Sequence, residues 1–155
     1  MPPWTLHFDG LYEPRYRPDG IATYGFVVRH GDEVVHEEGG LVLPPGEGGS
    51  ANVAEFAALV HGLGWFRGRD LGGCPLHVVG DSRLVVETVN GTWKLSSERL
   101  LPLRDLARSL VEEVRPASLV KVPRDQNAAA DALTRRAYHE AVAAHPEWGL
   151  GRRRP

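Results

Sequence analysis

The order in which strand and helix patterns follow one another is the strongest constraint on the fold. Three strand patterns come first, at Trp4–Asp9, Tyr24–Arg29 and Glu33–Leu43, the last two joined by a Gly31-Asp32 turn. A helix pattern, a strand, two helices, a strand and a last helix follow, over Asn52–Phe66, Pro75–Gly80, Ser82–Asn90, Ser97–Val114, Ala117–Val122 and Asn127–Ala144. This order predicts an α/β fold with a five-stranded mixed sheet and flanking helices. The first three strands form an antiparallel meander, and the last two join the first strand in parallel through right-handed crossovers.

The length of 155 residues predicts one domain spanning residues 1–155. We expect a structured core over residues 4–144 and a frayed tail over 145–155, which ends in three arginines, Arg152 to Arg154. Pro102 is expected to break or kink the first part of the helix over Ser97–Val114, because proline lacks the backbone N–H that a helix interior needs.

Four acidic residues are predicted to converge on one edge of this sheet. Asp9 ends the first strand and Asp81 ends the fourth, while Glu55 and Asp131 lie in the first turns of helices that begin at the same edge. In open sheets with helical crossovers, ligands bind at the carboxyl ends of the strands. The topology therefore brings together carboxylates that are far apart in the sequence.

Clustered carboxylates repel one another and are costly to remove from water without a partner. Mg²⁺ resolves this, because it prefers oxygen ligands and is typically held by carboxylates together with substrate phosphates. Two such ions roughly 3.5–4 Å apart can bracket a phosphate, one activating water and the other stabilising the leaving oxygen. The cluster of Asp9, Glu55, Asp81 and Asp131 therefore predicts phosphodiester hydrolysis with Mg²⁺, for which Mn²⁺ can substitute.

Each carboxylate alone has a purely structural interpretation, and these interpretations stay open here. Asp9 before Gly10 is typical of a turn, and Glu55 can close a capping box with Asn52. Asp81-Ser82 can cap the following helix, and Asp131 can pair with Arg135 one helical turn later. Their joint position on one edge is what favours the catalytic interpretation.

The residues around the carboxylates resemble those of the type 1 ribonucleases H. The matching motifs are Phe8-Asp9-Gly10 with Tyr24-Gly25, Asn52 to Leu59, Gly80 to Val86 with Asn90-Gly91-Thr92-Trp93, and Val122 to Asn127 with Ala130 to Leu133. The resemblance spans about residues 4 to 140, and four motifs in order form a specific signal.

The resemblance implies an endonuclease that cuts the RNA strand of an RNA–DNA hybrid. Two metal ions held by the four carboxylates would leave 5′-phosphate and 3′-hydroxyl ends. It also implies that Asn52 and the backbone near Gly10 and Leu11 contact the RNA.

The chain departs from many members of this family in two places. Its loop before the last helix is short, Pro123 to Gln126, and lacks the histidine that many members carry there. Arg124 lies in that neighbourhood and is a candidate substrate contact. The lysine-rich protrusion of some members is missing, as in the archaeal and some bacterial branches.

Two further residues are candidate substrate contacts. Ser50 follows a glycine-rich stretch that lacks the Gly-Lys-Ser/Thr of a P-loop, and its hydroxyl is a candidate phosphate ligand. Trp93 has two interpretations of equal weight, stacking on a nucleotide or anchoring the preceding helix in the core.

The composition limits how such a protein can bind nucleic acid. The net charge of −2 excludes binding by bulk positive charge and requires local contacts. Cys74 is the only cysteine, so the chain has no internal disulfide and no cysteine zinc site. No apolar run matches a membrane span and the N-terminus lacks signal-peptide features, so we expect a cytoplasmic protein, with no protein partner evident.

Two rival functions remain at this point. A 3′–5′ exonuclease on the same fold needs an Asp-x-Glu pair in the first strand, and here Leu11 stands two residues after Asp9. A noncatalytic nucleic-acid-binding module with a decayed site would be expected to have lost at least one of the carboxylates, and all four are present.

Overall fold

The computed structural model describes residues 2–16, 19–69 and 74–151. Its strands are β1 (Trp4–Glu13), β2 (Ile21–His30), β3 (Glu33–Leu43), β4 (Leu76–Gly80) and β5 (Ala117–Lys121). Its α-helices are α1 (Ala51–Arg67), α2 (Arg83–Asn90), α3 (Leu101–Glu113) and α4 (Ala128–Ala144). Two 3-10 helices, η1 (Arg124–Asn127) and η2 (Pro146–Gly151), flank α4.

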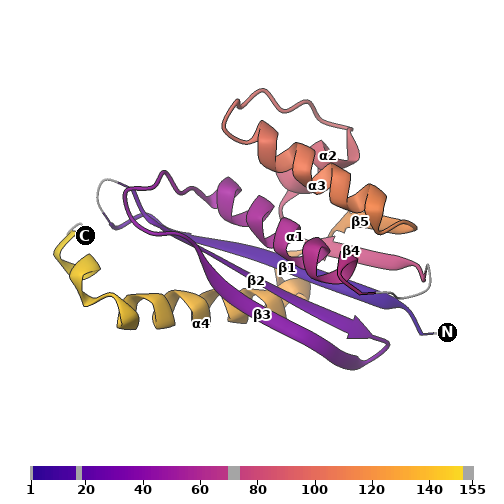
Figure 1. Ribbon diagram of the computed structural model, residues 1–155, viewed down its shortest axis with the longest axis horizontal. Helices are drawn as coiled ribbons and strands as arrows, with labels where there is room; N and C mark the ends of the chain where they lie inside the picture. The colour runs from indigo at the N-terminus through magenta and orange to yellow at the C-terminus, as the bar shows by residue number, and fades with distance from the viewer. Residues whose placement is uncertain (1, 17–18, 70–73, 152–155) are drawn as a thin grey trace.

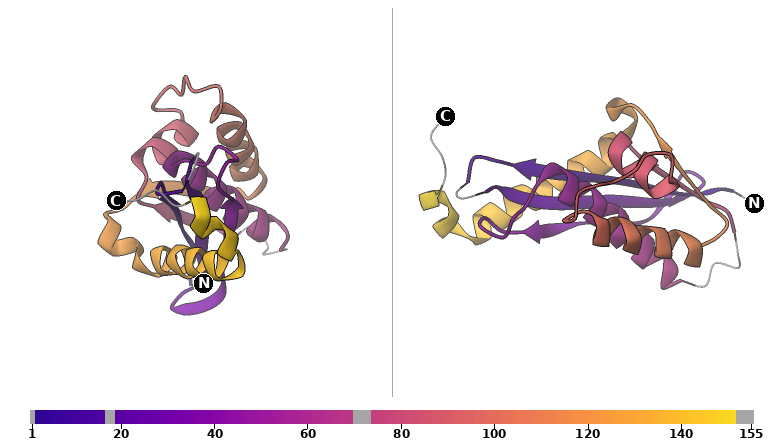
Figure 2. Two further views of the ribbon diagram at one scale, coloured as in Figure 1. Left: turned by 90° about the vertical axis from the view of Figure 1, so that its left-hand side faces the viewer. Right: turned by 90° about the horizontal axis from the view of Figure 1, so that it is seen from above.

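The strands form one mixed sheet in the order β3-β2-β1-β4-β5. The pairs β1–β2 and β2–β3 are antiparallel, whereas β1–β4 and β4–β5 are parallel. Helices α1, α2 and α3 cover one face of the sheet and α4 covers the other (Figures 1 and 2). The predicted fold class is confirmed.

The core lies between the sheet and α1. Leu6 and Phe8 of β1 and Phe56, Leu59 and Leu63 of α1 are fully buried there. Strand β2 is buried from Ile21 to Val28 because α1 packs on one of its faces and α4 on the other. No helix in the described part of the chain is long and apolar enough to cross a membrane.

Some element boundaries differ from the sequence predictions. Strand β1 does not end at Asp9 but continues to Glu13, because its antiparallel pairing with β2 continues to the Glu13–Ile21 pair. Helix α3 begins at Leu101 and not at Ser97, so that Pro102 lies in its first turn, where the missing N–H has no partner to lose.

The segment after α4 also differs from the frayed tail that we expected. Residues 146–151 form η2, and the ring of His145 stacks on that of Trp148 with their centroids 4.2 Å apart. The three arginines at positions 152–154 lie outside the described residues.

Two glycines in α1 give a matched test of the packing between α1 and β1. A methyl group at Gly62 would lie 2.8 and 2.9 Å from the buried δ-carbons of Leu6, whereas no atom of the described residues lies within 4 Å of one at Gly64. We expect Gly64→Ala to stabilise the protein by about 0.5–1 kcal/mol, because alanine favours the helix. Gly62→Ala should destabilise it by about 1 kcal/mol or more through overpacking.

Urea-induced unfolding of both variants measures these changes in the free energy of unfolding. If Gly62→Ala were as stable as Gly64→Ala, α1 would not be packed tightly against the side chain of Leu6.

Candidate active site

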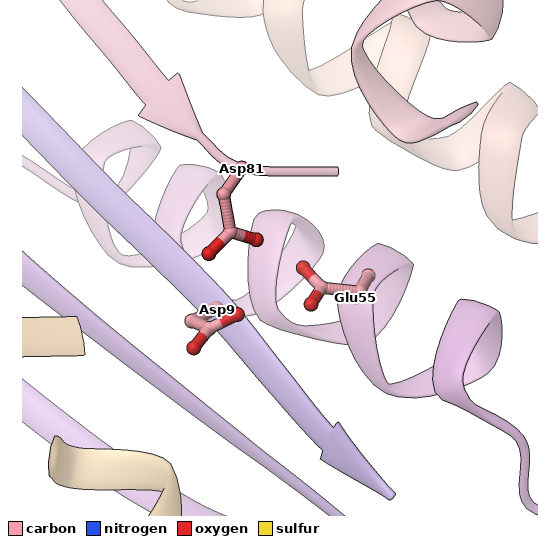
Figure 3. Close-up of side chains that lie close together, drawn as sticks. All are labelled: Asp9, Glu55 and Asp81. Atoms are coloured by element: carbon pink, nitrogen blue, oxygen red, sulfur yellow. The ribbon is translucent and has the colours of Figure 1, made fainter. Parts of the chain in front are cut away.

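Three carboxylates meet where β4 ends beside β1. Pairing between β1 and β4 stops at the His7–Val79 pair, so β1 runs on past the end of β4 with Asp9 on the open side. Asp81 directly follows β4, and Glu55 projects from α1 toward both (Figure 3). One carboxylate oxygen from each of Asp9, Glu55 and Asp81 lies within 4.8 Å of the other two.

Gly10 allows Glu55 to come this close to Asp9. A Cβ atom at Gly10 would lie 2.3 Å from the carbonyl carbon of Ala54 and 2.4 Å from the backbone nitrogen of Glu55. Only a residue without a side chain permits this approach of α1 to β1. The Gly10 N–H also donates a hydrogen bond to Oδ1 of Asp9 at 3.0 Å.

The cluster is electrostatically unfavourable on its own. Burial raises the pKa of Asp9 to about 7, a hydrogen bond with Glu55 opposes this, and the negative charges of Asp81 and Asp131 add to it. Burial also raises the pKa of Glu55, as do the charge of Asp9 and the hydrogen bond between the two carboxyl groups. At neutral pH, the buried carboxyls of Asp9 and Glu55 therefore resist full ionisation.

A divalent cation fits this arrangement. Oε2 of Glu55 is buried and has no hydrogen-bond partner among the described residues, although a buried carboxylate oxygen normally has one. Oxygen ligands from Asp9, Glu55 and Asp81 are the donors that Mg²⁺ and Mn²⁺ prefer. The same carboxylates line an open groove of about 270 Å³, which we call the carboxylate groove.

Asp131 also lines the carboxylate groove but lies outside the three-residue cluster. Its Oδ2 accepts a hydrogen bond from Nε of Arg135 at 2.9 Å, so the ion pair considered from the sequence is present. The preceding Asn127 does not cap α4 with its side chain. Instead, its buried Nδ2 donates to the carbonyl of Phe8 at 2.8 Å and ties the start of α4 to β1.

Of the two capping interpretations, the Asn52–Glu55 capping box is wrong, and the Asp81-Ser82 cap holds through Ser82 alone. Helix α1 is capped by Ser50, whose Oγ accepts from the Val53 N–H at 3.1 Å, and not by an Asn52–Glu55 capping box. Helix α2 is capped by Ser82, whose Oγ accepts from the Val85 N–H at 3.3 Å. The side chains of Glu55 and Asp81 are therefore not needed as caps.

The predicted substrate contacts divide into two groups. Gly10, Leu11 and Arg124 line the carboxylate groove beside the cluster. Asn52 is exposed on the first turn of α1, whereas the hydroxyl of Ser50 is engaged in the cap. Trp93 lies after α2 with 44% of its surface exposed and does not line the carboxylate groove.

Sequence reasoning missed the contacts that hold the loop before α1. The carboxylate of Asp19 accepts hydrogen bonds from the N–H groups of Gly46 and Gly48, both at 2.7 Å. Both glycines have positive φ, which favours glycine. From the segment between α2 and α3, Arg99 donates to the carbonyls of Glu47 and Gly48. The only sequence feature that could have indicated these contacts is the glycine-rich loop itself, because its backbone amides need hydrogen-bond partners.

Comparison with known proteins supports this description. A sequence model of the reverse transcriptase-like family matches residues 8–137. Ribonuclease HI of Halobacterium salinarum is 33% identical over 135 residues, which are 87% of this chain and 64% of that protein. The chain thus spans just under two thirds of the length of this curated relative.

Solved structures agree closely. The N-terminal ribonuclease H domain of a Mycobacterium tuberculosis protein superposes with a TM-score of 0.79 at 30% identity, covering 93% of this chain and 99% of that chain. LC11 ribonuclease H1, in complex with an RNA/DNA hybrid, has a TM-score of 0.79 at 25% identity, covering 90% of this chain and 99% of that chain.

The raised pKa values predict how stability depends on pH without metal. Unfolded carboxyls ionise near pH 4, roughly, whereas folded Asp9 keeps its proton up to about pH 7. The folded state therefore binds more protons in this window, and the free energy of unfolding should fall as pH rises through it. Glu55→Gln should make the free energy of unfolding depend less steeply on pH, because it removes one of the two carboxyls whose pKa is raised.

Denaturant unfolding in excess chelator at several pH values measures the slope. Asp32→Asn, at the exposed turn between β2 and β3, is the matched control and should leave the slope unchanged. A slope that is equal in Glu55→Gln and in the unaltered protein would contradict the electrostatic description.

Proposed function

Because the chain belongs to the type 1 ribonuclease H family, we propose that it is an endonuclease that hydrolyses the RNA strand of RNA–DNA hybrids. The products carry 5′-phosphate and 3′-hydroxyl ends. The observation that carries the proposal is the cluster of Asp9, Glu55 and Asp81 in an open groove. Further support comes from relatives that are named ribonuclease H and from one that binds an RNA/DNA hybrid.

In this proposal Asp9, Glu55, Asp81 and Asp131 hold two divalent cations, Mg²⁺ or Mn²⁺. Such ions would activate a water molecule and stabilise the leaving oxygen of the scissile phosphate. Asp9 and Glu55 are held in place by the contact at Gly10, and Asp81 is held by the end of β4. Rigid placement of charged groups before substrate arrives is a main source of catalytic rate enhancement.

Substrate recognition is assigned to residues around the cluster. The amide side chain of Asn52 projects from the first turn of α1, the helix that carries Glu55, and can meet a 2′-hydroxyl. The backbone at Gly10 and Leu11 and the side chain of Arg124 line the groove and can contact the RNA backbone. Ser50 and Trp93 stay weaker candidates, because the hydroxyl of Ser50 caps α1 and Trp93 lies outside the groove.

An exonuclease on the same fold is disfavoured by one position. Such an enzyme needs a second carboxylate two residues after Asp9, and here the apolar Leu11 lines the groove at that position. Because all four proposed metal ligands line the carboxylate groove, a noncatalytic module with a decayed site is also disfavoured.

Metal dependence and Asp81→Asn test the chemistry together. Cleavage should stop in excess chelator and return with Mg²⁺ or Mn²⁺, because the cluster offers no nucleophile of its own. Asp81→Asn keeps the shape of the side chain but removes a ligand charge, so the cleavage rate should fall by at least about a hundredfold. The protein should stay folded, since repulsion in the cluster decreases.

Asp125→Asn, at an exposed position of η1 beside the site, serves as the matched control and should keep full activity. Gel analysis of an end-labelled hybrid measures the rate, and circular dichroism checks the fold. Full cleavage in excess chelator would overturn the proposed mechanism.

The choice of substrate tests how RNA is recognised. The enzyme should cut RNA within a hybrid and spare the DNA strand and duplex DNA, because a 2′-hydroxyl donates and accepts hydrogen bonds that DNA lacks. Rates on an all-RNA hybrid strand, on a strand with one ribonucleotide and on duplex DNA should be compared. We expect efficient cleavage only with several consecutive ribonucleotides, and equal cutting of duplex DNA would indicate a general nuclease.

A further inference from the structure

A second groove continues from the carboxylate groove along the last residues of β1 and the middle of α4. We call it the lateral groove, and its volume is about 380 Å³. Among the described residues it is lined by Leu11, Tyr12, Glu13, Arg15, Arg135, Tyr138 and His139. None of the candidate metal ligands lines it.

The two grooves are continuous. Leu11, Tyr12 and Arg135 line both of them. Arg135 stands at the junction, with its Nε 2.9 Å from Oδ2 of Asp131. A strand whose phosphate lies at the carboxylate cluster can therefore pass directly into the lateral groove.

The lateral groove combines cations with aromatic rings. The side chains of Arg15 and Arg135 are 48% and 61% exposed, and each guanidinium has more donors than its ion pair uses. Glu13 orients Arg15 through contacts at 2.7 and 3.2 Å. The rings of Tyr12, Tyr138 and His139 form the rest of the polar wall.

This composition differs from that of the carboxylate groove, where the three clustered carboxylates dominate. Proteins that bind single-stranded nucleic acid combine positively charged groups along the backbone with aromatic side chains on which bases stack. The volume lies at the low end of pockets that hold one small organic molecule, so it suits one nucleotide and not a duplex.

We propose that the lateral groove binds an unpaired nucleotide of the cleaved strand, next to the position of the scissile phosphate. Arg15 and Arg135 contact its phosphate, and His139 and Tyr138 contact its base. The nucleotide is unpaired because a base that is paired within the hybrid faces its partner and cannot stack on protein side chains. This inference rests on the proposed function, since it assumes that the carboxylate cluster receives the RNA strand.

The test compares hybrids with and without a single-stranded end. Fluorescence anisotropy in excess chelator measures the dissociation constants of a blunt RNA–DNA hybrid and of hybrids with a short RNA overhang at the 5′ or the 3′ end. We expect one of the two RNA overhangs to strengthen binding by about fivefold or more, the lower end of what one stacked base contributes. A DNA overhang of the same length should add less.

Variants assign the gain to the lateral groove. Arg15→Ala and His139→Ala should abolish the gain from the overhang while leaving the binding and Mg²⁺-dependent cleavage of the blunt hybrid unchanged. Arg136→Ala is the matched control, because Arg136 is exposed on the same helix, pairs with Glu140 at 3.7 Å and does not line the groove. It should keep the full gain.

The outcomes separate this inference from the proposed function. The lateral-groove assignment would be overturned if neither RNA overhang strengthened binding, or if Arg136→Ala lost the gain in binding as fully as the two groove variants. The cleavage of the blunt hybrid would stand in both cases. An equal gain from a DNA overhang would overturn the assignment to the cleaved strand. Failure to cut any hybrid with Mg²⁺ would overturn the proposed function itself, and the anisotropy result would still show whether the groove binds unpaired RNA.

Discussion

The contact between α1 and β1 at Gly10 is the interaction on which the rest of the site depends. It places the backbone of Ala54 and Glu55 against a residue that has no side chain, and so brings the carboxyl of Glu55 beside that of Asp9. The shortness of β4 supplies the second requirement, because it leaves β1 open on one side at Asp9 and ends next to Asp81. The packing of the backbones therefore determines how far apart the carboxylates lie.

The carboxylate cluster stores unfavourable energy in the folded protein. Asp9 and Glu55 are buried beside each other, and the raised pKa values of both carboxyls reflect the resistance of this site to negative charge. The α1–β1 core, with Phe8 and Phe56 fully buried, provides the stability that offsets this strain. Binding sites that are unfavourable when empty are common where a protein must bind charge, because function and stability place different demands on the same residues.

The sequence was sufficient to predict the mixed sheet, its antiparallel and parallel strands and the meeting of Asp9, Glu55 and Asp81, because each of these depends on a local pattern and on topology. It was not sufficient to predict that β1 continues to Glu13. The strand prediction rested on the alternation of apolar and polar residues, and in the structure the matching alternation of buried and exposed residues breaks where Phe8 and Asp9 are both buried. The lateral groove was also missed. It depends on side chains from β1 and α4 that come together only in the folded chain.

The hydrogen bonds from Asp19 and Arg99 to the glycine-rich loop join three connections that are far apart in the sequence. These are the connection between β1 and β2, the loop between β3 and α1, and the segment between α2 and α3. Because the amides and carbonyls of one loop are satisfied by the other two, an insertion or deletion in any of them would leave partners behind in the others. The three connections are therefore coupled by hydrogen bonds, and a chimaera that exchanges the loop before α1 keeps these bonds only if Asp19 and Arg99 still reach the new loop.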